Sequence, residues 1–224
     1  MARNCRPGDR IRSRTLIGAH GQRVEIPDPE RLVHLQLRRF AGCPVCNLHL
    51  RSFARHHDEL VAAGVQEVAV FHTSADELAG HTSDLPFVTI GDPQKVLYRE
   101  FGARSSVRGV LDPRAWPTIA RALLVAVAGL LRGRVRPPRL RPEGGRYGLP
   151  ADLLIAPSGV VLAAKYGQRV DDHWEVDEVL ALARTTPVQP PTTSIPDGRA
   201  VRPADRDDAS TMDSRSHNHD RSIR

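Results

Sequence analysis

Cysteine is scarce in this sequence, with three residues in a chain of 224. That number is too small for a secreted scaffold held together by disulfides. Cys5 lies alone in a polar N-terminal stretch, whereas only two residues separate Cys43 from Cys46. In a reducing compartment an isolated Cys-x-x-Cys pair indicates catalytic or metal-binding chemistry sooner than a structural disulfide. The pair is therefore the first candidate for a functional site.

Long apolar runs are also absent. The longest covers residues 122–131, between Arg121 and Arg132, and is shorter than the ~20 apolar residues that a membrane-spanning helix needs. The basic N-terminus is followed by no apolar segment, so we expect no cleaved signal peptide. Together these absences predict a cytoplasmic protein.

Acidic residues are outnumbered by basic ones, 26 to 32, which gives a net charge of +6. This balance permits an anionic partner without identifying one. Aromatic residues make up only 4% of the chain, and none is interleaved with the arginines of residues 132–141. Prolines and glycines surround these arginines, as is typical of a solvated loop, and we expect no nucleic-acid partner.

The apolar pattern alternates strands and helices. Leu32, His34 and Gln36 alternate with Val33, Leu35 and Leu37, which predicts a strand that runs into the turn before Cys43. The next segments predict a helix from residue 45 to 63, a strand, a short helix, a strand and a helix, then a helical insertion, two strands and a closing helix.

This order predicts an α/β fold in which helices flank a central sheet with both parallel and antiparallel strand pairs. We expect a flexible N-terminus over residues 1–15 and one domain over residues 16–184, with an insertion at 113–146. Residues 185–224 are rich in Pro, Thr, Ser, Asp and Arg and nearly lack large apolar side chains. They cannot bury enough surface to offset their chain entropy, so we expect a disordered tail.

The local sequence suits Cys43 and Cys46 to redox chemistry. Pro44 fits the first turn of a helix, which places Cys43 at the N-cap, where free backbone N–H groups lower a thiol pKa. Cys46 follows one turn later, close enough to form a disulfide with Cys43. Two buried structural thiols and a metal site are the alternatives. Zinc usually takes four ligands, and the sequence has no second Cys-x-x-Cys and no His-x-x-x-His, so we expect no metal and no cofactor.

Several segments resemble the thioredoxin superfamily. "CPVC" after the first core strand resembles its active-site motif, and "GLPADLLI" resembles the segment in which a cis-proline faces that motif. Together with "VAVFHTSADELAGH" and "LPFVTIGDPQKVLYREFGA", these segments are most similar to the peroxiredoxin-like alkyl hydroperoxide reductase and thiol-specific antioxidant group, over roughly residues 16–184. The resemblance implies a thioredoxin-like fold and a cis Leu149–Pro150 bond that helps to shape the substrate groove.

The resemblance further implies that Cys43 reduces peroxides or disulfides, that Cys46 resolves the intermediate, and that a thiol donor such as a thioredoxin-type protein returns the electrons. Phe40 and Gln36 stand where typical peroxiredoxins have a threonine and a proline. This departure favours dithiol exchange over peroxidase activity. Arg146 is the first candidate for the family's activating arginine, and Arg39 and Arg51 are the alternatives.

A non-catalytic binding or regulatory module is the alternative function. It would use the apolar helix predicted over residues 115–131 together with the arginine-rich loop. A helix that is apolar nearly all round must be buried or must meet a partner. Packing against the domain or in a homodimer is the simpler explanation, and contact with a membrane surface is the alternative.

Overall fold

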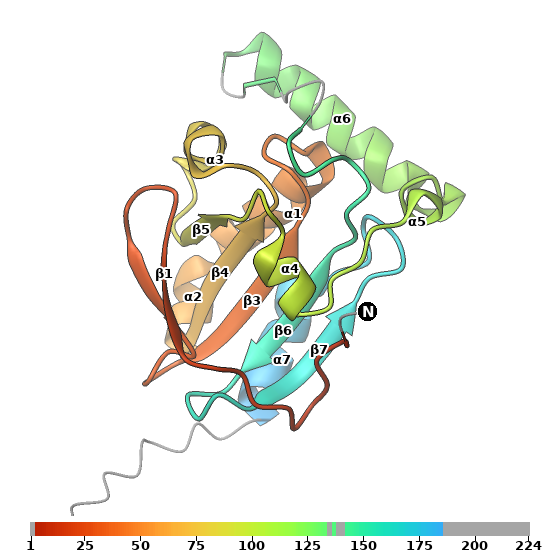
Figure 1. Cartoon of the computed structure of the whole chain (residues 1–224). Helices are drawn as coiled ribbons and strands as arrows, with labels where there is room; N and C mark the ends of the chain where they lie inside the picture. The colour runs from red at the N-terminus through yellow and green to blue at the C-terminus, as the bar shows by residue number, and fades with distance from the viewer. Residues whose placement is uncertain (1–2, 134–135, 138–141, 186–224) are drawn as a thin grey trace, which may run out of the picture. The chain divides into compact units, whose positions relative to one another are not determined.

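The chain forms a five-stranded mixed sheet that is covered on both faces (Figure 1). The computed structural model describes residues 3–133, 136–137 and 142–185. The strand order is β5-β4-β3-β6-β7; β3, β4 and β5 are parallel, and β6 is antiparallel to both β3 and β7. The predicted mixed α/β fold is confirmed. The sheet strands are β3 (Leu32–Arg38), β4 (Val65–Phe71), β5 (Val88–Gly91), β6 (Ala151–Ile155) and β7 (Val161–Tyr166).

Two hydrophobic clusters cover the two faces of the sheet. Successive residues of a strand point to opposite faces. On β3, Leu32 belongs to one cluster and Val33 to the other. The first cluster contains side chains from α1, α2 and α7, and the second contains side chains from α4 and β2. These covering elements are α1 (Pro44–Arg55), α2 (His57–Ala62), α7 (Val176–Thr185), α4 (Val96–Glu100) and β2 (Arg23–Ile26).

The N-terminal segment, for which the sequence predicts flexibility, contacts the edge strand β7. Gly8 donates a backbone hydrogen bond to Val161, and Arg10 forms a bridge with Val160, at the start of β7. The chain then forms an antiparallel hairpin of β1 (Arg14–Ile17) with β2, an element that the sequence pattern did not reveal. The predicted tail, residues 185–224, lies outside the described residues except for Thr185.

The insertion after α4 contains the apolar helix α6 (Trp116–Leu131), preceded by α5 (Val107–Val110) and a short 3-10 helix, η1 (Pro113–Ala115). The long helix packs against α1 and lies at the periphery of the sheet and its helices (Figure 1). By length and composition the stretch Val107–Leu131 could cross a membrane, and only 11% of its most apolar window is buried. The predicted arginine-rich loop lies partly outside the described residues. The remaining helix, α3 (Ala75–Thr82), follows β4.

Candidate active site

The Cys-x-x-Cys segment lies where β3 ends and α1 begins. Gly42 has a φ of +73°, a left-handed conformation that favours glycine and turns the chain toward the helix. Cys43 is the N-cap of α1, and Pro44 follows at the start of the helix. The backbone N–H of Cys46 points at the sulfur of Cys43 over 3.5 Å. The structure thus places the three residues as the sequence predicts, with a helix N-terminus directed at one sulfur.

The thiol of Cys43 is acidic. Burial raises its pKa, but hydrogen bonding to Cys46, the positive charge of Arg39 and the backbone N–H groups of Cys46 and Val45 outweigh burial. The pKa of Cys43 falls from 9.0 to about 6. At pH 7 a thiol with this pKa is roughly nine-tenths thiolate, the form that attacks peroxides and disulfides.

The thiol of Cys46 behaves in the opposite way. Burial and the neighbouring Cys43 raise the pKa of Cys46 well above 9.0. Both cysteines are free in this structure and almost fully buried, Cys43 with 1% of its surface exposed. The pair therefore consists of a thiolate and a protonated thiol, a division of roles that suits a nucleophile and its resolving partner.

Arg39 supplies the positive charge beside Cys43. One amino group of its guanidinium lies 3.7 Å from the sulfur of Cys43, and the other donates to the backbone carbonyl of Arg146. The guanidinium also lies over the ring of Phe40, 5.2 Å from the ring centroid. Arg146, the first candidate from the sequence, thus contributes a backbone carbonyl that holds Arg39. Arg51 instead pairs with Asp84 on the surface.

Phe40 and Gln36, which replace the threonine and proline of typical peroxiredoxins, are both buried. The ring of Phe40 lies against His72, with centroids 6.4 Å apart. A different threonine lies near the cysteine loop: Thr73, just after β4, accepts a hydrogen bond from the backbone N–H of Ala41 at 3.0 Å. The hydroxyl group of Thr73 therefore lies beside the cysteine loop, but it comes from the segment that follows β4.

A glycine-rich segment before β6 closes over this region. A Cβ added at Gly144 would lie 2.3 Å from the carbonyl oxygen of His72, and one added at Gly148 would lie 2.8 Å from its Nε2 atom. Glycine at both positions lets the backbone approach His72 this closely. Burial lowers the pKa of His72 to about 4, so its imidazole is neutral at pH 7.

The expectation for Pro150 is wrong in one respect. The Leu149–Pro150 bond is trans, and among the described residues the cis bond is Ile26–Pro27. Leu149 donates its N–H to Arg104, and the carbonyl of Pro150 accepts from Gly167. These bonds extend the backbone straight into β6, an arrangement that trans geometry, the default for X–Pro, satisfies. Pro150 lines a pocket with Leu149, Tyr166 and Gly167, none of which comes from the cysteine loop.

A buried polar network lies beneath α1, and sequence reasoning missed it. His34 contacts Glu67 at 2.8 Å and Asp152 at 3.2 Å, and Asp152 accepts from Arg38 at 2.6 Å. Gln36 bridges Glu67 and Arg38. The polar residues of the alternating strand 32–38 were the sequence signal for this network. When both faces of a strand are covered, its polar side chains are buried and require hydrogen-bond or charge partners.

The charges of this network stabilise one another. Burial lowers the pKa of His34, but the carboxylates of Glu67 and Asp152 raise it to about 9. Burial raises the pKa of Asp152, but Arg38 and His34 hold it well below its usual range. Two cations therefore face two carboxylates in the interior, as buried charges require.

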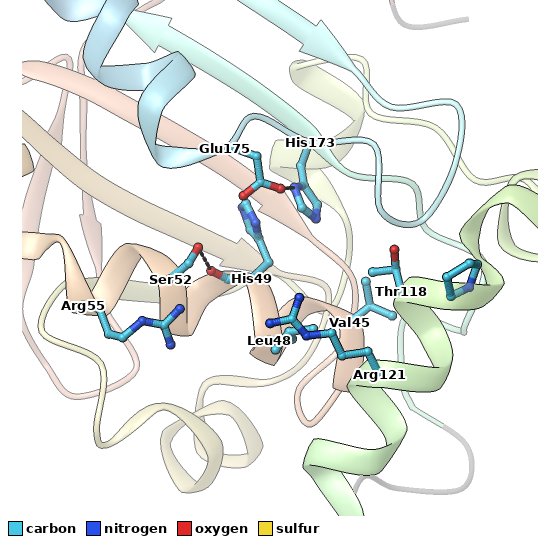
Figure 2. Close-up of a pocket in the computed structure, with 10 residues that line it drawn as sticks. Val45, Leu48, His49, Ser52, Arg55, Thr118, Arg121, His173 and Glu175 are labelled. Carbon is cyan, nitrogen blue, oxygen red and sulfur yellow. Dashed lines mark hydrogen bonds and ion pairs between the residues drawn. The ribbon is translucent and has the colours of Figure 1, made fainter.

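A pocket of about 490 Å³ lies between α1, the start of α6 and the residues before α7 (Figure 2). His49, His173 and Glu175 converge there, with their ligand-type atoms within 4.8 Å of one another. The two imidazole rings are tilted by 35° with centroids 3.4 Å apart, and Arg38 donates toward Nε2 of His49. Imidazoles that share a zinc ion must each direct a nitrogen at it over about 2.0 Å. Rings with centroids only 3.4 Å apart, one of them with its Nε2 facing the guanidinium of Arg38, do not fit that arrangement, so the cluster is not assigned as a metal site.

The sequence of the chain was compared with protein-family models. The family model described as AhpC/TSA family matches residues 7–132, more than half of the chain. The chain belongs to the AhpC/TSA family. This membership supports a thiol-based oxidoreductase activity, and the matched region includes Arg39, Cys43 and Cys46. No protein with curated function matches the sequence.

Solved structures of a peroxidoxin, a peroxiredoxin and a thiol peroxidase share the fold. Peroxidoxin BcpB from Mycobacterium tuberculosis superposes with a TM-score of 0.56 at 14% identity, over 80% of this chain and 97% of that one. The 2-Cys peroxiredoxin of Plasmodium vivax gives 0.54 at 13% identity, over 80% and 81%. Thiol peroxidase from Chromobacterium violaceum gives 0.53 at 14% identity, over 83% and 90%. The predicted thioredoxin-like, peroxiredoxin-like fold is confirmed.

Proposed function

We propose that this AhpC/TSA protein is a thiol–disulfide oxidoreductase that reduces peroxides or disulfides by cycling Cys43 and Cys46 between dithiol and disulfide. The observation that carries the proposal is the pairing of Arg39 with the sulfur of Cys43 at a helix N-terminus. Thiolates are formed at such sites because both the guanidinium and the helix N–H groups favour negative charge. Cys5 lacks this setting, and burial raises its pKa.

With a hydroperoxide, the Cys43 thiolate attacks the terminal oxygen, the O–O bond breaks, and an alcohol leaves with one proton from the medium. Cys43 becomes a sulfenic acid. The Cys46 sulfur then attacks the sulfur of Cys43, which forms the disulfide and releases water. A dithiol donor reduces the disulfide by exchange, and its own two thiols become a disulfide.

With a disulfide substrate, the Cys43 thiolate attacks one sulfur and releases the other as a thiolate, which takes a proton from the medium, and a mixed disulfide is left on Cys43. Cys46 loses its proton, attacks Cys43 and releases the second thiol. The raised pKa of Cys46 keeps it protonated until this step. The phenylalanine at position 40 supplies no hydroxyl to orient a peroxide, which favours this second route.

Mass spectrometry of the reduced protein tests the proposal. Graded hydrogen peroxide and an oxidised low-molecular-weight disulfide are supplied in separate arms. In both arms the wild-type protein forms the Cys43–Cys46 disulfide, whereas Cys46→Ser accumulates the sulfenic acid with peroxide and the mixed disulfide with the disulfide substrate. Cys5→Ser is the matched control and behaves as the wild type.

The alternative, a non-catalytic module on the same scaffold, makes a different prediction. In that case Cys43→Ser would leave peroxide and disulfide consumption at the wild-type level, and the wild-type pair would stay reduced in both arms. Either result would refute the proposed cycle.

A further inference from the structure

The apolar helix α6 turns a broad apolar face away from the rest of the described fold. Residues three or four positions apart share one side of a helix. One such set on α6 is exposed, and Leu124 and Leu131 keep 73% and 82% of their surface accessible. The large exposed side chains of this set are Trp116, Leu123, Leu124, Val127, Leu130 and Leu131. We call this set the α6 apolar face.

The opposite side of α6 carries mostly small side chains and packs closely against the domain. Ala122 is buried, as is Ala115 of η1 just before the helix, and Ile119 packs against the core cluster. Ala126 and Gly129, on the same side, are partly buried. These small side chains let α6 lie directly on α1. The fold therefore leaves the large apolar residues uncovered and buries the small ones, which is the reverse of the usual arrangement.

This packing argues against a spanning helix, although Val107–Leu131 passes the test of length and composition. The helix α6 has 16 residues, about 24 Å, which is shorter than the ~30 Å hydrocarbon core of a bilayer. Its inner side is also held against α1 along the domain surface. The geometry suits a helix that lies in the plane of a membrane surface, with one side in the lipid and the other on the protein.

The sequence around α6 is rich in arginine. From Pro113 to Pro142 the sequence contains seven arginines and no aspartate, glutamate or lysine. Among the described residues, Arg121 and Arg132 are exposed and lie eleven positions apart, so both project from the same flank of α6. Arginines beside an apolar helix face are attracted to anionic headgroups while the apolar side chains enter the acyl boundary.

We propose that the α6 apolar face and its flanking arginines dock the protein on the surface of an anionic phospholipid bilayer. Such docking would hold the protein where lipid hydroperoxides form, but the proposal stands on α6 alone and does not depend on the chemistry of Cys43. Trp116 at the N-terminal end of α6 suits the headgroup level, where tryptophan is enriched.

Vesicle flotation with the full chain tests this docking. Vesicles of phosphatidylcholine alone are compared with vesicles of phosphatidylcholine and phosphatidylglycerol. We expect the protein to float only with the anionic vesicles, and less as salt rises. The double variant L124E/L131E places charges on the exposed face without touching the core and should lower partitioning at least ~10-fold, since burying each leucine contributes strongly to binding. R132Q should lower partitioning by roughly fivefold.

The control is Val96→Glu, which places one carboxylate on an exposed apolar residue of α4 and should partition as the wild type. Thermal melts of the variants confirm that each is folded. The proposal is wrong if the anionic vesicles do not retain the folded wild type, or if L124E/L131E partitions equally. It is also wrong if the protein forms a homodimer that L124E/L131E dissociates and binds no vesicles. Retention of the protein in the bilayer after a carbonate wash would instead indicate a spanning helix and would likewise refute the proposal.

Discussion

The guanidinium of Arg39 lies 3.7 Å from the sulfur of Cys43 while its second amino group is held by the backbone carbonyl of Arg146. This pairing joins the end of β3 to the segment before β6, more than a hundred residues later in the chain. It fixes a positive charge beside a nucleophile that is buried and therefore cannot rely on water to stabilise a thiolate.

Replacing Arg39 should weaken the acidity of Cys43. Arg39→Met keeps most of the apolar stem over Phe40 and removes the charge, and we expect the pKa of Cys43 to rise from about 6 by about one unit or more. The pH dependence of iodoacetamide labelling at Cys43, followed by mass spectrometry, measures the shift. Arg51→Met removes a surface charge of α1, the helix that Cys43 caps, and serves as the control. An unchanged midpoint in Arg39→Met would show that the helix N-terminus alone sets the acidity.

The stability of the reduced protein should depend on pH through Cys43. Its pKa is lower in the folded chain, about 6, than the ordinary value of 9.0, so the unfolded chain binds more protons between these values. Stability from the thiolate is therefore present above pH 9 and is lost as pH falls toward 6. We expect the free energy of unfolding of wild type minus that of Cys43→Ser to grow by roughly 2–4 kcal/mol from pH 6 to pH 9. Urea titrations under reducing conditions measure it; a flat difference contradicts the assigned pKa.

His34 should remain protonated well above neutral pH. Its pKa of about 9 lies above the ordinary 6.5, so its contribution to stability is fully present below pH 6.5 and is lost as pH rises through 9. Heteronuclear NMR of the imidazole nitrogens should show both of them protonated at pH 7.5. His49, whose pKa burial lowers well below 6.5, should be neutral at the same pH and serves as the internal comparison. A neutral His34 at pH 7.5 would mean that Glu67 and Asp152 do not hold it as described.

Asp152→Asn should be strongly destabilising. The substitution removes the carboxylate that contacts Arg38 at 2.6 Å and leaves a buried guanidinium without its charge partner. Breaking a buried pair in this way costs about 3–5 kcal/mol. Asp84→Asn removes the exposed partner of Arg51 and should cost less than about 1 kcal/mol. Urea denaturation of both variants at pH 7 tests the contrast, and equal losses would rule out a stabilising role for the buried network.

The strand–loop–helix unit around the cysteines could be read from local sequence. Alternation over residues 32–37 marked β3, the proline after Cys43 marked the start of α1, and apolar periodicity marked α6 and α7. Local sequence patterns predicted element boundaries less well where tertiary packing determines them. The helix predicted over residues 45–63 breaks at His56 into α1 and α2. The β1–β2 hairpin escaped notice because its four-residue strands carry little apolar pattern.

The sequence also indicated only in part which arginine lies beside Cys43. Sequence reasoning named Arg146, Arg39 and Arg51 as candidates, but nothing in the sequence could rank them, because charge alone does not say where a side chain points. Only the fold brings the guanidinium of Arg39 to the sulfur and the carbonyl of Arg146 to the guanidinium. The same holds for Pro150, whose place in a pocket with Tyr166 and Gly167 depends on the fold rather than on its neighbours in sequence.

By itself, the sequence determined the order of strands and helices, the placement of Cys43 at a helix N-cap and the arginines that flank an apolar helix, because each follows from periodicity or from neighbouring residues. The tertiary structure decided which faces are covered. It buried the polar side of β3 under α1, so that His34, Gln36 and Arg38 needed partners from β4 and β6. It also left the large apolar side of α6 exposed. Burial depends on contacts between distant segments, and these contacts set both the charges of the interior and the surface that remains open to a partner.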